Sequence, residues 1–208
     1  MHSEPPVSQR LRALVRSMPR TGITLSELIR SVGNDGLLIL VALLTLVFLI
    51  PISIPGVSTV FGAAILLISV SRLSGRELWI PSKLEHRVIG TRKLRPLLRK
   101  ALSWLKKLER VSKPNRIQWL VAAGPVAFFN NAALILGAVL LMMPFGLIPF
   151  SNTFPAVAIL FLAIGLLQRD GVCILLGHIS NVVTIIYFGV LIGGGGLAMR
   201  EVFNRFVG

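Results

Sequence analysis

The sequence predicts an all-α integral membrane protein, and three features support this prediction: composition, charge distribution and an internal repeat. Hydrophobic residues make up 54% of the 208 residues, and charged residues only 14%. No charged side chain occurs in residues 36–71, 117–168 or 171–199. Each run exceeds the roughly 20 residues that a helix needs to cross a bilayer. Residues 1–30 are polar and basic and are not expected to be a signal peptide.

A hydrophobic hairpin occurs twice, in Leu37–Leu73 and in Asn131–Leu167. Each copy has an uncharged apolar arm, a break rich in proline and polar residues, a second apolar arm, and then arginine. At a spacing of about 94 residues the sequence aligns Leu40 with Leu134, Pro55 with Pro149, and Thr59 with Thr153. Interrupted hydrophobic segments in corresponding places of a repeat point to a transporter-like membrane architecture.

The first repeat, residues 34–80, has its break at residues 51–56. Its arms are about 22 Å long as helices, which is short for a hydrocarbon core of about 30 Å. Three residues that disfavour a helix form the break: Pro51, Pro55 and Gly56. We therefore expect a re-entrant hairpin with polar side chains near the middle of the bilayer. These side chains are Ser53, Ser58 and Thr59. The alternative is two thin or tilted spans whose short loop reaches the far surface.

The second repeat, residues 117–170, has a longer break at residues 144–155. This break contains three prolines, Pro144, Pro149 and Pro155. Asn152 and Thr153 are its polar candidates for contacting a substrate, and the Asn152 amide could instead satisfy backbone groups that the break frees.

A C-terminal transmembrane segment is expected over residues 171–199, followed by a tail over residues 200–208. Polar residues in Gly177–Asn181 interrupt this segment in the sequence, and the Gly193–Gly196 run is expected to end its helix. His178 is expected to be a packed, hydrogen-bonded residue rather than a proton carrier. Cys173 is the single cysteine, so no intramolecular disulfide can form.

The net charge of +14 is distributed as in a membrane protein rather than a nucleic-acid-binding protein. Of the 22 Lys and Arg residues, five fall in residues 1–30 and 14 in residues 72–116. Basic segments beside membrane spans mark the cytoplasmic side and attract anionic lipid head groups. No zinc-ligand spacing or helix-turn-helix pattern supports nucleic-acid binding. If both basic segments are cytoplasmic, the first hairpin enters and leaves the membrane on one face.

The two basic segments both read as amphipathic helices. The N-terminal arm, residues 1–33, contains a capping box at Thr24 and Glu27 and a helix stop at Gly33. The arm lies either on the membrane surface or against the cytoplasmic face of the protein itself. The linker, residues 81–116, is expected to lie along the inner leaflet. The alternative is a solvated helix whose apolar side packs on a partner protein.

Ionisable residues at the hairpin borders are the remaining site candidates. Asp35 precedes the first hairpin; the residues that follow the hairpins are Arg72 and Arg76, then Arg169 and Asp170. Charges so close to hydrocarbon are costly unless they are paired or face an aqueous cavity. Arg72 and Arg76 are four residues apart, so on a helix they could grip a phosphate or carboxylate together. Snorkelling to lipid head groups is the simpler explanation of these arginines.

Two strings of residues resemble the ExoD family of exopolysaccharide-synthesis proteins. One is Pro144…Pro149…Asn152…Pro155-Ala156 followed by Gly165-Leu166-Leu167…Asp170-Gly171. The other is Pro51…Pro55-Gly56 followed by Gly75-Arg76…Trp79-Ile80-Pro81. The resemblance runs from about Thr24 to Val190 and departs from the family at Leu78 and in Lys113–Arg116. It implies a multi-pass protein of the bacterial inner membrane associated with exopolysaccharide production, and it supplies no reaction.

Two classes of function fit these features, and neither is enzymatic. The sequence lacks a nucleophile-base constellation, a metal-ligand cluster and a phosphate-binding loop, so we expect no enzyme, cofactor or metal. The first class is a small transporter or flippase for an anionic or lipid-linked substrate, which could act as a homodimer. The second is a scaffold or regulator that docks exopolysaccharide-synthesis proteins through its basic face. The expected partners are anionic lipid, a second copy of the chain and those proteins, but no nucleic acid.

Overall fold

The computed structural model describes residues 12, 16, 23–49, 57–75, 88–89, 96, 99, 103, 116–145 and 148–207. Ser53, Arg76, Pro51, Pro55 and Gly56 lie outside these residues, as does most of the 81–116 linker. In chain order the elements are β1 (Ile23–Thr24), α2 (Leu25–Leu46), η1 (Val47–Leu49), α3 (Val57–Ser74), β2 (Val88–Ile89), η2 (Gln118–Val121), α6 (Pro125–Leu141), α7 (Thr153–Gln168) and α8 (Gly171–Val207). Apart from the two-residue strands, the described part of the chain is helical, as predicted.

Helix α2 begins where the sequence predicts, but Gly33, the predicted helix stop, interrupts the helix without ending it. The Thr24 hydroxyl accepts from the Glu27 amide at 3.2 Å, and the Glu27 carboxylate accepts from the Thr24 amide at 3.0 Å. The predicted capping box is therefore confirmed. Gly33 has φ +63° and interrupts the helix, because glycine adopts this conformation without a side-chain clash. The apolar part of α2 continues with η1 as Asp35–Leu49.

A two-stranded antiparallel pairing was not predicted. It joins Ile23 to Ile89 and Thr24 to Val88. The N-terminal arm and the basic linker are thus in contact at this point, which includes Thr24 of the capping box.

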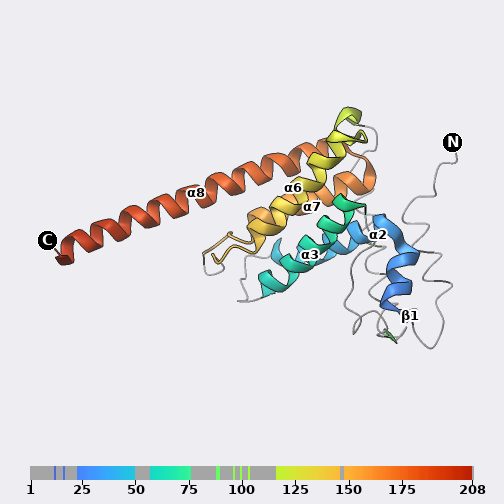
Figure 1. Cartoon of the computed structure of the whole chain (residues 1–208), viewed down its shortest axis with the longest axis horizontal. Helices are drawn as coiled ribbons and strands as arrows, with labels where there is room; N and C mark the ends of the chain where they lie inside the picture. Colours follow the sequence, from blue (N-terminus) through green and yellow to red (C-terminus); the bar gives the residue numbers. More distant parts are fainter. Residues whose placement is uncertain are drawn as a thin grey trace.

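The two hairpins pack on each other crosswise, with α3 against α6 and α2 against α7 (Figure 1). The start of α3 lies at the end of α6, because a Cβ on Gly62 would come within 2.4 Å of Met142 Cγ. The rings of Phe48 in η1 and Phe61 in α3 also meet there, 5.8 Å apart. The ends of η1 and α6 therefore lie together with the starts of α3 and α7, and we call this end of the helices the break end. The opposite end, where α3 and α7 finish, is the charged end, defined by Asp35, Arg72, Arg116, Arg169 and Asp170.

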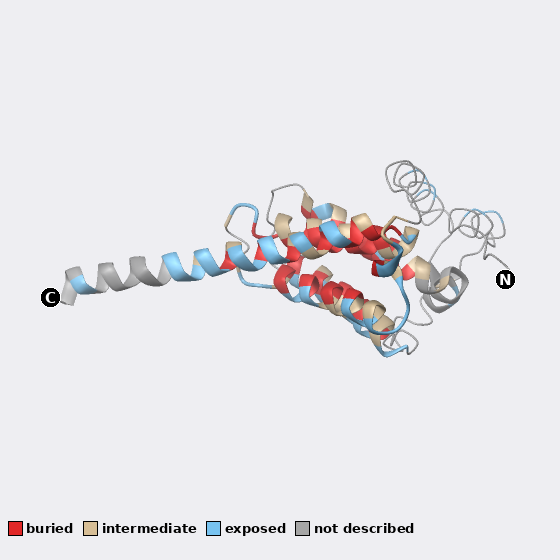
Figure 2. Ribbon diagram, turned by 90° about the horizontal axis from the view of Figure 1, so that it is seen from above, coloured by how far each residue is buried: buried red, intermediate tan, exposed pale blue. Residues whose placement is uncertain are grey.

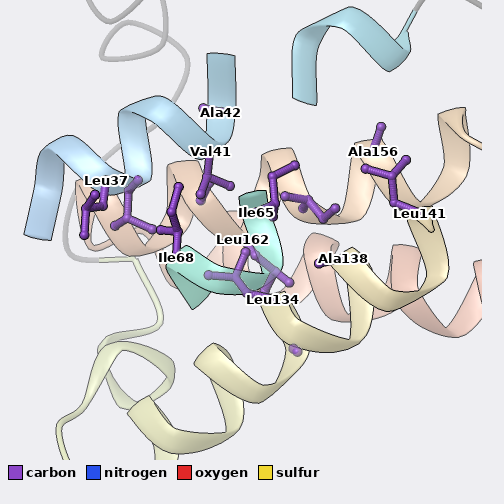
Figure 3. Close-up of a cluster of buried hydrophobic side chains, with 14 of the residues drawn as sticks. Leu37, Val41, Ala42, Ile65, Ile68, Leu134, Ala138, Leu141, Ala156 and Leu162 are labelled. Atoms are coloured by element: carbon purple, nitrogen blue, oxygen red, sulfur yellow. The ribbon is translucent and has the colours of Figure 1, made fainter. Parts of the chain in front are cut away.

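An apolar core fills the space between these four helices. The side chains in Figure 3 come from all of them and point toward one another. Val41, Ile65, Leu134 and Leu162 are fully excluded from solvent. In Figure 2 the buried residues gather in this region, whereas many residues along the middle of α8 are exposed, among them Ile186, Val190 and Ile192. The interior between the hairpins is packed with aliphatic side chains.

Helix α8 is longer and more continuous than the sequence predicts. It runs without interruption from Gly171 to Val207 and projects beyond the break end (Figure 1). The expected interruption at Gly177–Asn181 and the expected end at Gly193–Gly196 are both wrong. Gly177 serves a close contact instead, since a Cβ there would lie 2.5 Å from Leu162 Cγ. A helical glycine costs only about 1 kcal/mol relative to alanine, so the glycine run does not by itself end a helix.

Among the described residues, one helical segment is long and apolar enough to cross a membrane, namely Gly171–Gly194. Only 28% of an 18-residue apolar stretch within it is buried, whereas the central helix of a soluble protein is mostly buried. Four apolar segments are shorter than a usual span: Asp35–Leu49, Ser58–Ser74, Pro125–Leu141 and Thr153–Gln168.

Candidate functional site

The predicted site residues that the structure describes separate into two groups at opposite ends of the helices. Ser58, Thr59, Asn152 and Thr153 lie at the break end, where α3 and α7 begin. Arg72, Arg169 and Asp170 lie at the charged end. The 16 residues of α7 place about 24 Å between these ends. The two groups cannot contact one small ligand at the same time.

At the charged end, Asp170 is fully buried and forms an ion pair with Arg116. Arg116 pairs with Asp170 Oδ2, to which the Cys173 thiol also donates at 3.4 Å. The other carboxylate oxygen, Oδ1, accepts from the Val172 amide at 3.0 Å. The hydrogen bond to Asp170 raises the pKa of Arg116 above its ordinary value. Asp170 therefore caps α8 and anchors the end of the basic linker, a structural role that leaves no oxygen exposed.

The backbone reinforces this anchor. The Gly171 amide donates to the Arg116 carbonyl at 2.8 Å. A Cβ on Gly171 would come within 2.3 Å of the Ile117 carbonyl oxygen, so only glycine fits. Arg116 was not predicted as a site residue, because its partner lies 54 positions away in the sequence. An Asp-Gly pair before an apolar run was the one available signal, since aspartate is a favoured N-cap.

The other charged residues at this end differ in their surroundings. Arg72 is half-buried in the last turn of α3, and Asp35 attracts it electrostatically. Arg169 is exposed and ends α7 with φ +54°. Of the predicted cations that the structure describes, Arg169 is thus the most open to a ligand or to lipid head groups.

At the break end, polar side chains are buried at the start of α7. Asn152 is 7% exposed and makes no capping hydrogen bond. The Thr153 hydroxyl oxygen is buried and has no hydrogen-bond partner among the described residues. Pro155, expected in the break, instead occupies the first turn of α7, where its missing N–H is not needed. In α3, Ser58 is buried and Thr59 exposed.

Aromatic rings attach the second break to α8. The Tyr187 hydroxyl donates to the Pro149 carbonyl at 2.7 Å. The ring of Tyr187 lies 5.0 Å from that of Phe154, and Phe145 lies 5.0 Å from Phe188. Phe150 is 53% exposed and adopts φ +63°, an uncommon conformation for a bulky residue. The described part of this break is therefore an ordered turn with one aromatic side chain facing outward.

Amide side chains join α6 to α8 between the two ends. Asn130 donates to the Leu120 carbonyl at 2.7 Å, so its carbonyl oxygen faces His178 Nε2 at 2.9 Å. Because an amide oxygen only accepts, His178 must donate from Nε2. The expectation of a packed, hydrogen-bonded histidine is confirmed. Asn181 donates to the Ala133 carbonyl at 2.9 Å one helical turn further on.

Comparison with known proteins agrees with the resemblance that the two sequence motifs indicate. The family model described as "Exopolysaccharide synthesis, ExoD" matches residues 7–190. The chain belongs to the ExoD family. It is 47% identical over 189 residues to Protein ExoD of Rhizobium meliloti (strain 1021), covering 91% of this chain and 78% of that protein.

A more distant relative is "Uncharacterized protein slr1875" of Synechocystis sp. (strain ATCC 27184 / PCC 6803 / Kazusa). It is 32% identical over 164 residues, which cover 76% of this chain and 74% of that protein. No solved structure matches the chain. Family membership supports a role in exopolysaccharide synthesis, and the apolar Gly171–Gly194 helix is consistent with membrane association.

Proposed function

We propose that this ExoD-family chain is a small multi-pass transporter or flippase of the bacterial inner membrane, acting on a lipid-linked or anionic intermediate of exopolysaccharide synthesis. Its working unit would be the two hairpins, with polar groups at their breaks and cations at the cytoplasmic mouth. The crosswise packing of the hairpins is the observation that carries this proposal.

The packing is what a two-fold relation between the repeats requires. The spacing of 94 residues relates α2 to α6 and α3 to α7. Exchanging the repeats then turns the α2–α7 contact into the α6–α3 contact, and both contacts are present. Gly75 and Arg169, which this spacing also aligns, both have positive φ after the second helix of their hairpin. Since α3 and α7 both begin at the break end, the repeats would be parallel, with an axis along the helices.

Helix α8 supports placing the second break inside the membrane. Its uncharged part, residues 171–199, is about 44 Å long, close to the 40–45 Å of a bilayer with its head groups. Tyr187, whose hydroxyl donates to the Pro149 carbonyl, is only about 24 Å from Gly171 along the helix. A perpendicular α8 would therefore leave the break about 20 Å short of the far surface, as in a re-entrant hairpin.

Labelling of single cysteines tests this placement. On a Cys173→Ala background, cysteine is introduced at Asn152 or, as a matched amide control, at Asn131 on α6. A membrane-impermeant maleimide is then added from each side of oriented vesicles. Re-entry predicts that position 152 reacts poorly from the periplasmic side. Labelling of position 152 from that side alone, at the rate of a water-exposed loop, would contradict the placement.

A scaffold or regulator is the second candidate, and the packed core favours it. Val41, Ile65, Leu134 and Leu162 leave the bundle interior aliphatic, so transport requires the hairpins to separate. Complementation of exopolysaccharide production in a deletion strain distinguishes the two functions. A transporter predicts that Asn152→Ala loses function while the protein accumulates. A scaffold predicts that this variant is silent and that reversing the charges of Arg99, Lys100, Lys106 and Lys107 abolishes function.

A further inference from the structure

The break end of α7 offers uncharged polar groups rather than an anion site. All described charges of the helical bundle, including Arg72, Arg116 and Arg169, lie at the opposite end. Along α8, the first charged residue in the sequence is Arg200. Arg200 is about 20 Å along the helix from Tyr187.

Backbone amides at the start of α7 are also occupied. The Thr153 and Phe154 amides both donate to the Phe150 carbonyl, at 3.0 and 3.1 Å. Pro155 has no amide hydrogen, and the Ala156 amide donates to the Asn152 carbonyl at 3.1 Å. A helix N-terminus binds phosphate through free N–H groups, so the start of α7 lacks the feature that phosphate binding needs.

Two polar side chains at the start of α7 remain available to contact a ligand, together with the aromatic rings of the same segment. Asn152 is more than nine-tenths buried without a capping hydrogen bond, and the buried Thr153 hydroxyl has no described partner. A buried polar group without a partner is costly and calls for an explanation. An amide both donates and accepts, as does a hydroxyl, so the pair matches a ligand that is itself rich in hydroxyl groups.

The aromatic side chains add the apolar part of such a site. Phe150, two positions before Asn152 in the sequence, is exposed, and its ring lies 6.2 Å from that of Phe154, which in turn contacts Tyr187. The positive φ of Phe150 costs energy that glycine at this position would avoid. A sugar fits this combination of groups. Its hydroxyl groups can hydrogen-bond to the amide and the hydroxyl, and the C–H groups on its ring face can pack on an aromatic ring.

We infer that the break end of α7 binds the saccharide portion of the substrate, through Asn152, Thr153 and the Phe150 ring, and does not bind its phosphate. The inference rests on the proposed function and specifies how the substrate binds: the sugar part of a lipid-linked substrate contacts the break end. The family's role in exopolysaccharide synthesis is consistent with a saccharide ligand.

Direct binding measurements on the full chain in lipid nanodiscs test the inference. The probe is a size-fractionated oligosaccharide pool from the exopolysaccharide of the strain that carries the gene, and saturation-transfer NMR detects its binding. Inorganic pyrophosphate serves as the anionic competitor. Asn152→Ala and Phe150→Gly are expected to weaken oligosaccharide binding roughly tenfold each. Phe150→Gly keeps the positive φ accessible, so its effect is not a loss of fold.

Matched controls lie at the charged end. Asn131→Ala removes the same amide from α6, and Phe129→Ala removes a phenylalanine that is 66% exposed. Both are expected to bind as the unsubstituted chain does. Equal binding by Asn152→Ala and its control, full competition by pyrophosphate, or no binding by the unsubstituted chain would each overturn the inference. Site-specific binding together with full complementation by Asn152→Ala would instead reject the transporter and leave the saccharide site standing.

Discussion

Removing Arg116 tests how the charged end is held together. Arg116→Ala leaves Asp170, which is 0% exposed, without its cation. Breaking a buried ion pair by deleting one partner costs about 3–5 kcal/mol. Asp170 keeps the hydrogen bonds from the Val172 amide and the Cys173 thiol, so we expect the lower end, about 3 kcal/mol.

The reverse deletion is expected to cost less. Asp170→Asn removes the charge but keeps an oxygen that can cap α8. It leaves Arg116, whose side chain is 38% exposed and can turn toward water. We expect about 1 kcal/mol for Asp170→Asn. In the double variant no buried charge remains, so its cost should fall below the sum of the two single costs.

The single cysteine provides the assay. Cys173 is buried, so a thiol-reactive fluorophore reports thermal unfolding of the detergent-solubilised chain. At about 2–4 °C per kcal/mol, Tm should fall by about 6–12 °C for Arg116→Ala and 2–4 °C for Asp170→Asn. Arg169→Ala, which removes an exposed neighbouring arginine, is the control and should change Tm little. Equal losses in the two single variants, or strict additivity, would refute this reasoning.

Two further predictions concern α8 and α2. Gly177→Ala should destabilise the chain by about 1–3 kcal/mol, because the added Cβ would lie 2.5 Å from Leu162 Cγ. The control is Gly189→Ala, whose Cβ would meet nothing within 4 Å. This control should be neutral or stabilising in the same Tm assay. Hydrogen bonds from Thr24 lower the pKa of Glu27. The capping box should therefore be fully formed above the ordinary pKa of glutamate and be lost only as pH falls through the lowered pKa. NMR of the Thr24 amide proton would show this midpoint, and a midpoint at or above the ordinary value would contradict the prediction.

Features set by neighbouring residues were predictable from the sequence. The capping box needs only Thr24 and Glu27 at the right spacing, and the bend at Gly33 follows from one glycine. The apolar helices follow from long uncharged runs. In each case the deciding contact lies within one turn of helix, so a local pattern contains the information.

Features set by distant residues were not predictable. The partner of Asp170 is 54 positions away, and that of Tyr187 is 38 positions away. The Gly193–Gly196 run was misread because helix propensity is a weak determinant that context overrides. At the candidate site, Asn152 and Thr153 stood out as polar residues in a break, but only the structure shows that the nearby amides are already bonded.

The separation of the two ends constrains any transport cycle. About 24 Å of α7 lie between Asn152 and Arg169, and an aliphatic core fills the bundle between the hairpins. A substrate with sugar and phosphate parts would thus meet neutral groups at one end and cations at the other, either in succession or with its two parts apart. Substitutions at Asn152 should therefore change discrimination among sugars, whereas substitutions at Arg169 should change the dependence on salt. A variant at either end that altered both properties together would mean that the hairpins move enough to bring the ends into one site.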